Sequence, residues 1–301
     1  MKEFKKNRQL YIMCLPAILL LIAFAYVPMA GIWMAFTKYN IKDGIFGSEF
    51  VGLQNFKYFF TGSTGMGPKV IYNTLYINFF GLIFGTIVPI TIAICFNEVK
   101  GKVFKKVTQS AMFFPYFLSW VVVGAIVYAF FSTDTGMINR MLKDMGHNII
   151  RWYAEKKYWK GIIITVDVWK WCGYNSIIYM AAMSNFDSSL YEAATVDGAN
   201  RFQRIWYLTL PLLKPTVIIL CLMSIGRIFF GDFGMIYGIV GNNSLLYDEV
   251  AVIDTYVYSA MRSLGFSYTT AIGLFQSVMG LILVTVSNHL AKKVNEGEGL
   301  F

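Results

Sequence analysis

Charged side chains are scarce in this sequence. Only 14% of the 301 residues are Asp, Glu, Lys or Arg, whereas soluble domains carry about 25%. Because 56% of the residues are hydrophobic, too few polar groups are present to cover the surface of a soluble protein. Proline is scarce (7 residues), and the 26 glycines follow no triplet period, which excludes collagen-like and disordered chains. The composition therefore predicts an integral membrane protein.

Motifs for metal binding, nucleotide binding and catalysis are missing as well. The four cysteines lie in apolar stretches without a C-x-x-C pair, and neither His147 nor His289 is followed by a second ligand three or four residues later. No G-x-x-x-x-G-K-[ST] motif occurs, since the nearest approach, residues 62–69, has the wrong spacing. No nucleophile, base and acid occur at an interpretable spacing. We therefore expect no metal, no other cofactor and no enzymatic activity of the chain's own.

The net charge of +9 has two interpretations. In a soluble protein a strongly basic balance indicates nucleic-acid binding. In a membrane protein, Lys and Arg instead gather at the cytoplasmic ends of the spans. The second interpretation fits the composition, and we expect no nucleic-acid partner.

Six apolar stretches are long enough to cross a bilayer, which takes about 20 helical residues. They are residues 11–36, 71–96, 111–131, 161–183, 215–240 and 269–290. Lys2, Lys5, Lys6 and Arg8 precede the first stretch, as in a signal peptide, but its apolar core is too long and no small-residue cleavage site follows. We predict an all-α integral membrane protein with one transmembrane domain over residues 1–301. The basic N-terminus and the shorter basic inner segments favour cytoplasmic N- and C-termini.

Two predicted outer segments are more than linkers. Residues 51–60 are aromatic and amphipathic, which is typical of a helix lying along the membrane interface. Residues 132–160, called here the outer segment, contain Trp152, Tyr153, Tyr158 and Trp159. These aromatic residues fit an interfacial belt or, alternatively, a docking surface for an external partner.

Four charged residues fall inside the predicted spans: Asp167, Lys170, Arg227 and Asp232. Each would cost about 2.5–3.5 kcal/mol if left alone in the bilayer, so we expect them to line a channel or to face one another. Lys170 and Asp232 lie at similar predicted depths, which predicts an ion pair if their helices are neighbours. The alternative is that Lys170 extends to the outer interface. Arg227 has no partner at its own depth and is expected to line the path or to meet a second subunit.

Residues 187–211 predict two short helices on the cytoplasmic side. Ser189 followed by Glu192 forms a predicted capping box, and Gly198 stands where a helix ends in a left-handed conformation. Asn200 and Gln203 repeat the capping pattern for the second helix, which we expect Pro211 to end. Such a helix–turn–helix has a shape that fits a groove on another protein.

This segment resembles the signature of the membrane subunits of binding-protein-dependent ABC importers. The matching residues are Glu192, Ala193, Ala194, Asp197, Gly198, Leu210 and Pro211. Residues 51–56, 115–122, 253–258 and 271–277 resemble segments of the carbohydrate-importing, maltose-type permeases, and within them the branch for oligo- and polysaccharides. The resemblance extends from Leu10 to Lys293.

The resemblance implies a permease subunit in the bacterial cell membrane that forms half of a channel and moves an oligosaccharide into the cytoplasm. Its implied partners are a second homologous permease, two cytoplasmic ATPase subunits, an extracellular solute-binding protein and membrane lipid. Residues 187–211 would be the loop that couples the permease to the ATPase, with Glu192 and Gly198 at the joint. The alternative is a secondary transporter or a channel for a small solute, which would have no reason to carry this loop. In the outer segment, basic residues exceed acidic ones by three, which favours an acidic glycan.

Overall fold

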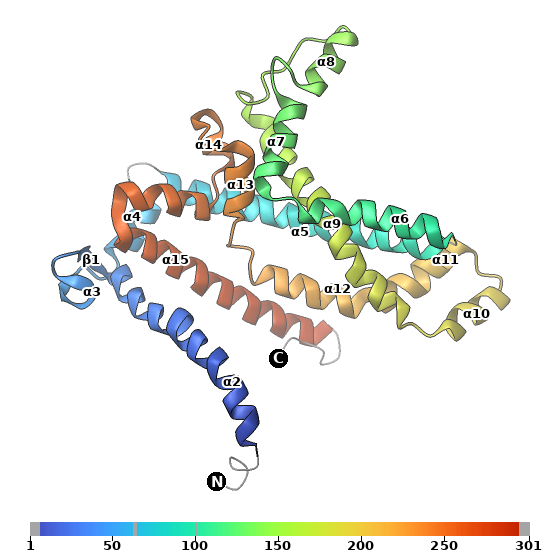
Figure 1. Ribbon diagram of the computed structural model, residues 1–301, viewed down its shortest axis with the longest axis horizontal. Helices are drawn as coiled ribbons and strands as arrows, with labels where there is room; N and C mark the ends of the chain where they lie inside the picture. Colours follow the sequence, from blue (N-terminus) through green and yellow to red (C-terminus); the bar gives the residue numbers. More distant parts are fainter. Residues whose placement is uncertain (1–6, 63–64, 100, 295–301) are drawn as a thin grey trace. The chain divides into compact units, whose positions relative to one another are not determined.

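A computed structural model of the chain describes residues 7–62, 65–99 and 101–294 (Figure 1). Lys2, Lys5 and Lys6, which contribute to the predicted orientation, lie outside the described residues. The chain divides into two compact units. Unit 1 comprises Met1–Gly65 and Val257–Gln276, and unit 2 comprises Met66–Tyr256 and Ser277–Phe301.

Unit 1 joins a long apolar helix to a small hairpin and an amphipathic helix. Its elements are α2 (Arg8–Leu21), the π-helical turn η1 (Ile22–Tyr26), the 3₁₀ segment η2 (Val27–Phe36), β1 (Thr37–Asn40), α3 (Gly44–Gly47), β2 (Ser48–Phe50), α4 (Gln54–Thr61) and residues 257–276 of α15 (Ile253–Val294). Strands β1 and β2 pair antiparallel, with Thr37 opposite Phe50. Asn55 stabilises the junction because its Nδ2 donates to the carbonyls of Ala35 (2.9 Å) and Thr37 (3.1 Å).

Helix α4 confirms the helix predicted near residues 51–60. Its aromatic face packs on residues 257–276, where the rings of Tyr58 and Tyr268 lie 5.3 Å apart and those of Phe59 and Phe275 lie 5.9 Å apart. Phe59 is buried. Tyr58 and Phe60 stay 43% and 42% exposed, so protein within unit 1 covers only part of the aromatic face.

Unit 2 is a bundle of helices of unequal length. They are α5 (Met66–Glu98), α6 (Lys102–Phe113), η3 (Phe114–Phe117), α7 (Trp120–Phe131), α8 (Met137–Asp144), η4 (Lys156–Tyr158), α9 (Trp159–Ser184), α10 (Ser188–Val196), α11 (Arg201–Arg204), η5 (Ile205–Thr209), α12 (Leu210–Ile225), α13 (Phe233–Val240), α14 (Ser244–Val250) and the two ends of α15. Helices α5 and α9 pack along one another, as do α7 and α13 (Figure 1).

Four helices of the described chain are long and apolar enough to cross a membrane. They are Arg8–Phe36, Met66–Glu98, Arg201–Ile225 and Ile253–Lys292. The bent pair Lys102–Phe117 and Trp120–Phe131 gives a fifth if it is one crossing. Helix α9, which holds Asp167 and Lys170, is less apolar and is not among them.

Two of the predicted spans are broken rather than continuous. Residues 111–131 divide between α6–η3 and α7, which meet at an angle of 103°. Pro115 lies in η3, shortly before the break, and the Ser119 side chain caps α7 by accepting from the Val122 amide. Residues 215–240 divide between α12 and α13, with the non-helical residues 226–232, called here the 226–232 link, between them. The Asp232 side chain caps α13 by accepting from the Met235 amide. The sequence prediction treated both segments as continuous because their mean hydropathy is high, although Pro115 near the first break and Arg227 and Asp232 in the second interrupt the apolar sequence.

Helix α15 also departs from a straight span. Gly265 has a φ of 82° and a ψ of −179°, so two helices meet there at a kink. A side chain adopts a positive φ only with strain, so glycine suits this position.

The outer segment is a packed structure, which corrects its interpretation as an aromatic belt. Trp159 has no exposed surface and Trp152 has 9%. Asn139, itself buried, holds the segment together because it donates to the carbonyl of Ile150 (2.8 Å) and accepts from the amide of Ile150 (3.1 Å) and the indole of Trp152 (3.0 Å). The tryptophans are therefore core residues and face neither lipid headgroups nor a partner.

Two apolar cores lie at different levels of unit 2. One packs α5, α7, α9, α13 and α14 around Ile77, Val123 and Ile163. The other packs α5, α9 and α12 around Ala93, Tyr179 and Leu213. The residues of α5 and α9 that lie between these two cores belong to neither core.

The contact between α7 and α13 leaves no room for a side chain. A Cβ at Gly124 would clash with the carbonyl of Gly238. We therefore expect Gly124→Ala to destabilise the protein by about 1–3 kcal/mol, as overpacking does. Thermal unfolding of the detergent-solubilised protein, followed by size-exclusion chromatography, measures the effect. The control is Gly161→Ala in α9, where a Cβ meets no atom within 4 Å. Equal stability of the two variants would contradict the packing described here.

Candidate functional site

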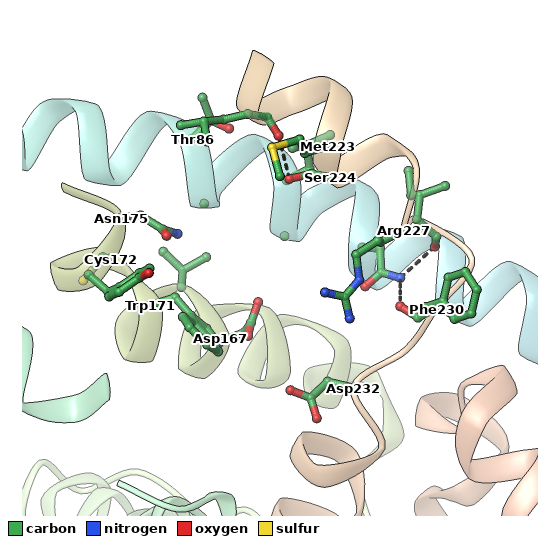
Figure 2. A pocket seen from close by; sticks show the side chains of 18 of the residues that line it. Thr86, Asp167, Trp171, Cys172, Asn175, Met223, Ser224, Arg227, Phe230 and Asp232 are labelled. Atoms are coloured by element: carbon green, nitrogen blue, oxygen red, sulfur yellow. Dashed lines mark hydrogen bonds between the residues drawn. The ribbon is translucent and has the colours of Figure 1, made fainter. Parts of the chain in front are cut away.

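A cavity of about 990 Å³ lies between the two cores of unit 2 (Figure 2). Its walls come from residues 78–86 of α5, residues 167–179 of α9, residues 220–224 of α12, the 226–232 link and the first residues of α13. The break between α12 and α13 opens this space, because an unbroken helix would continue the packing of the cores. The cavity is therefore a consequence of the chain's irregular backbone.

Three of the four charged residues expected in a channel line this cavity. Asp167 comes from α9, and Arg227 and Asp232 come from the 226–232 link; Figure 2 shows all three around the same space. Arg227 is exposed, and its guanidinium makes no hydrogen bond or ion pair with any residue that the structure describes. Its five donors are thus available inside the cavity.

Several side chains bond the 226–232 link, among them Asp254, which accepts from the Gly231 amide (2.6 Å), and Asn78. Asn78 on α5 donates from Nδ2 to the carbonyls of Ile228 (2.7 Å) and Phe230 (2.9 Å). Both carbonyls belong to non-helical backbone and lack a helical donor. Asn78 therefore fixes the segment that carries Arg227.

Lys170 does not form the predicted ion pair with Asp232. Its ammonium donates to the carbonyls of Pro115 (3.2 Å), Tyr116 (2.9 Å) and Leu118 (2.6 Å). These bonds use all three of its N–H groups. The alternative that Lys170 reaches the outer interface is also wrong, because the residue is only 5% exposed. It lies behind the cavity wall and stabilises the break between η3 and α7.

Aromatic side chains supply much of the remaining cavity wall, and the sequence analysis missed them. Trp171 and Tyr174 line the cavity, and Tyr174 stacks on Tyr116 with ring centroids 4.6 Å apart and planes 11° apart. Positions 167, 171, 174 and 178 share one face of a helix, and all four line the cavity. A helical projection of α9 around Asp167 would have found this face.

The first helix of the 187–211 segment begins two residues earlier than predicted. Asp187, not Ser189, caps α10, because its carboxylate accepts from the Ser189 amide at 2.9 Å. Hydrogen bonds from the Ser189 backbone and side chain lower the pKa of Asp187 below its usual value. Glu192 then lies beyond the first turn and is exposed, so it is not part of a capping box.

The turn between the two helices agrees closely with the prediction. Gly198 has a φ of 79°. The Ala199 amide donates to the Ala194 carbonyl and the Gly198 amide donates to the Thr195 carbonyl, which together form a Schellman motif. Asn200 and Gln203 form the predicted capping box of α11.

Pro211 does not end the second helix, contrary to the prediction. Helix α11 continues through the π-helical turn η5 into α12, so Arg201–Ile225 is one helix of 25 residues. The π turn bonds the Leu210 amide to the Ile205 carbonyl and thereby shifts the ladder just before the proline, which lacks an N–H. Pro211 is then accommodated at the start of α12.

The segment presents a hollow of about 340 Å³ between its two helices. Ala194, Asp197, Gly198 and Arg204 are among the lining residues. Nearby apolar side chains are strongly exposed: Val196 at 87%, Phe202 at 85%, Trp206 at 67% and Tyr207 at 71%. Of the other signature residues, Ala193 and Pro211 are exposed and Leu210 is half-buried.

Comparison with known proteins identifies the family. The family described as "Binding-protein-dependent transport system inner membrane component" matches residues 85–296, which include the 187–211 segment and most of the cavity wall. The chain belongs to this family. The permease is therefore a multi-pass inner-membrane component of a transport system, and its family is one of transport components, not of enzymes.

The relatives of the permease include importers of sugars. Protein LplB of Bacillus subtilis (strain 168) is 36% identical over 305 residues, which cover 100% of this chain and 93% of that protein. The polygalacturonan/rhamnogalacturonan transport system permease protein YteP of the same strain is 37% identical over 297 residues, which cover 98% and 91%. A chain in the crystal structure of a bacterial alginate ABC transporter, in complex with an alginate pentasaccharide-bound periplasmic protein, has a TM-score of 0.89 at 33% identity and covers 99% of both chains.

The role of Asn78 in holding the 226–232 link can be tested by removing its amide. Asn78→Ala removes two hydrogen bonds to carbonyls, one part-buried and one exposed, and each such bond contributes about 0.5–1.5 kcal/mol to stability. We expect a lower unfolding temperature for the purified permease complex in detergent. The matched control is Asn175→Ala, because Asn175 lines the same cavity but makes no hydrogen bond with a described residue. The interpretation is wrong if both variants unfold at the same temperature.

Proposed function

We propose that the permease forms one half of the pathway through which an ABC importer carries an acidic oligosaccharide into the cytoplasm. The observation that carries this proposal is the cavity, which combines aromatic faces with an arginine whose guanidinium bonds no described residue. A sugar offers flat apolar faces to aromatic rings and hydroxyl groups to polar side chains. A carboxylate on the sugar would match the bidentate donors of Arg227.

We also propose six crossings with both termini in the cytoplasm. Helix α9, 26 residues long, is long enough to span the bilayer. Its polar residues face the cavity or the carbonyls of the break, so they need not meet lipid. The bent pair α6–α7 and the broken pair α12–α13 would each count as one crossing.

The names of the relatives support the substrate class. One is a permease for polygalacturonan and rhamnogalacturonan, and the alginate transporter is described as importing an acidic polysaccharide. The basic surplus of the outer segment agrees with an anionic substrate. Within the cavity, however, the carboxylates of Asp167 and Asp232 would repel an anionic sugar. Binding of such a sugar therefore requires that this repulsion be limited.

The 187–211 segment is the proposed coupling loop. Its exposed apolar side chains, Phe202 and Trp206 among them, have no cover within the unit, and a soluble partner would bury them. We propose that one of two ATPase subunits binds this surface, while a second permease completes the pathway and a solute-binding protein delivers the sugar from outside. Because the two helices are fixed by a Schellman turn and a capping box, a push on the loop would reach α9 and α12 directly.

The proposed coupling role of the turn at Gly198 can be tested with a substitution that strains its backbone. No atom lies within 4 Å of a Cβ at this position, so Gly198→Val changes the backbone preference without creating a clash. We expect the complex to assemble but to lose most of its substrate-stimulated ATP hydrolysis and uptake. Glu192→Lys, which reverses an exposed charge on α10, should have the same effect. Normal stimulation of hydrolysis in both variants would show that the turn is not the coupling joint.

Arg227 provides the test of the substrate class. In proteoliposomes containing the intact complex and its binding protein, uptake of a galacturonate trimer is compared with uptake of a galactose trimer. We expect the wild type to prefer the acidic sugar. Arg227→Gln should reduce acidic uptake at least about tenfold, the equivalent of one charge-assisted hydrogen bond, and leave neutral uptake nearly unchanged. Arg227→Lys should fall between them because it keeps the charge and loses the bidentate geometry. A wild type that takes up only the neutral trimer contradicts the proposal.

A further inference from the structure

Two residues outside the cavity connect its wall to both helix breaks of unit 2. Lys170 on α9 and Trp120 at the start of α7 are absent from the cavity lining. Lys170 reaches the break between η3 and α7 through three carbonyls. Trp120 reaches the 226–232 link through Asp232. The two side chains also contact each other, since the ammonium lies 5.1 Å from the centre of the Trp120 ring.

Asp232 receives a donor on each of its carboxylate oxygens. The indole N–H of Trp120 donates to Oδ2 at 2.8 Å, and the Met235 amide donates to Oδ1 at 2.9 Å. The second bond is the cap of α13 and would form with any Asp in this position. The bond from Trp120 is different, because it comes from another helix and fixes the direction in which the carboxylate points.

Lys170 in turn fixes Trp120. Its ammonium is held by backbone at three points, so it cannot follow the indole if the indole moves. A cation over the ring of a tryptophan attracts it, and more strongly where water is excluded. Close packing adds to this, because a Cβ at Gly234 on α13 would lie 3.0 Å from Cδ1 of the Trp120 indole. The indole is therefore clamped between α13 and the ammonium.

We propose that Lys170 and Trp120 are positioning residues that hold the Asp232 carboxylate against the cavity wall, so that the cavity accepts an anionic sugar. The assignment rests on the proposed function. Like charges that approach within a few ångströms repel strongly in a low dielectric. When both oxygens of the carboxylate accept hydrogen bonds, the group keeps its position and the donors compensate part of its charge. A carboxylate released from Trp120 could turn toward the sugar and toward Arg227.

The decisive variant is Trp120→Phe, which removes the N–H and keeps an aromatic ring above the ammonium. The readout is the ratio of galacturonate-trimer uptake to galactose-trimer uptake in proteoliposomes of the intact complex with its binding protein. General damage to the permease would lower both uptakes together and leave the ratio unchanged. We expect Trp120→Phe to lower the ratio about tenfold, the equivalent of one hydrogen bond to a charged group. Trp169→Phe, on the exposed side of α9, is the matched control and should leave the ratio unchanged.

Combining variants separates action through Asp232 from other effects. Asp232→Asn removes the charge, so Trp120→Phe should no longer change the ratio in that background. Lys170→Met should lower the ratio and Lys170→Arg should restore it, because arginine keeps both the charge and the donors. If the Lys170→Met complex does not assemble, the Trp120 and Asp232 variants decide the matter alone.

Two results would overturn the assignment. One is an unchanged ratio in Trp120→Phe, and the other is an equal change in the presence and absence of the Asp232 charge. A wild type that takes up only the neutral trimer contradicts the acidic substrate and this assignment together. A wild type that takes up the acidic trimer, with the two variants acting independently, contradicts this assignment alone and leaves the proposed function intact.

Discussion

Backbone hydrogen bonding is the constraint on which the rest of this structure depends. In a lipid bilayer a carbonyl without a donor costs several kcal/mol, so a helix can break there only where side chains replace the lost bonds. The permease breaks two apolar helices, at residues 118–119, directly after η3, and at residues 226–232. Lys170 supplies three donors to the first break, and the Asn78 amide supplies two bonds to the second. Lys170 and Asn78 thus replace part of the helical hydrogen bonding that the two breaks lose.

The breaks in turn create the cavity and place its charges. A continuous helix from Leu210 to Val240 would bury its apolar residues against α5 and α9, as α12 does at Leu213. The 226–232 link instead leaves this packing and brings Arg227 and Asp232 into the space between the two cores. The same irregular backbone thus explains why a cavity is present and why it is charged. It also explains why α9 is less apolar than its neighbours, since its residues face this space and the first break.

The sequence predicted local features well and non-local ones poorly. The turn at Gly198 and the capping box at Asn200 depend on a few consecutive residues, and both are present in the structure. The start of α10 was displaced because Asp187 and Ser189 are both good caps, and only the backbone distinguishes them. The helix breaks leave little trace in hydropathy. We predicted an ion pair between Lys170 and Asp232 because their charges are opposite. The actual partners of Lys170 are backbone carbonyls, and these leave no mark in the sequence because every residue has one. The cost of burying a charge predicted that Asp167, Arg227 and Asp232 line a channel or face one another; all three lie on the cavity wall, and a channel at this place stays a prediction.

The charges in and behind the cavity balance one another. Lys170 and Arg227 are cations, and Asp167 and Asp232 are anions, so their formal charges cancel. A strongly cationic cavity would bind an anionic sugar tightly and release it slowly, and a pathway must let its substrate leave as well as enter. With Lys170 bound to carbonyls and Asp232 fixed by Trp120, Arg227 is left as the charged donor that no described residue occupies. A substrate would therefore find one charged hydrogen-bond donor, Arg227, in surroundings whose formal charge is otherwise close to balanced. Such a site can select an anionic sugar and still release it.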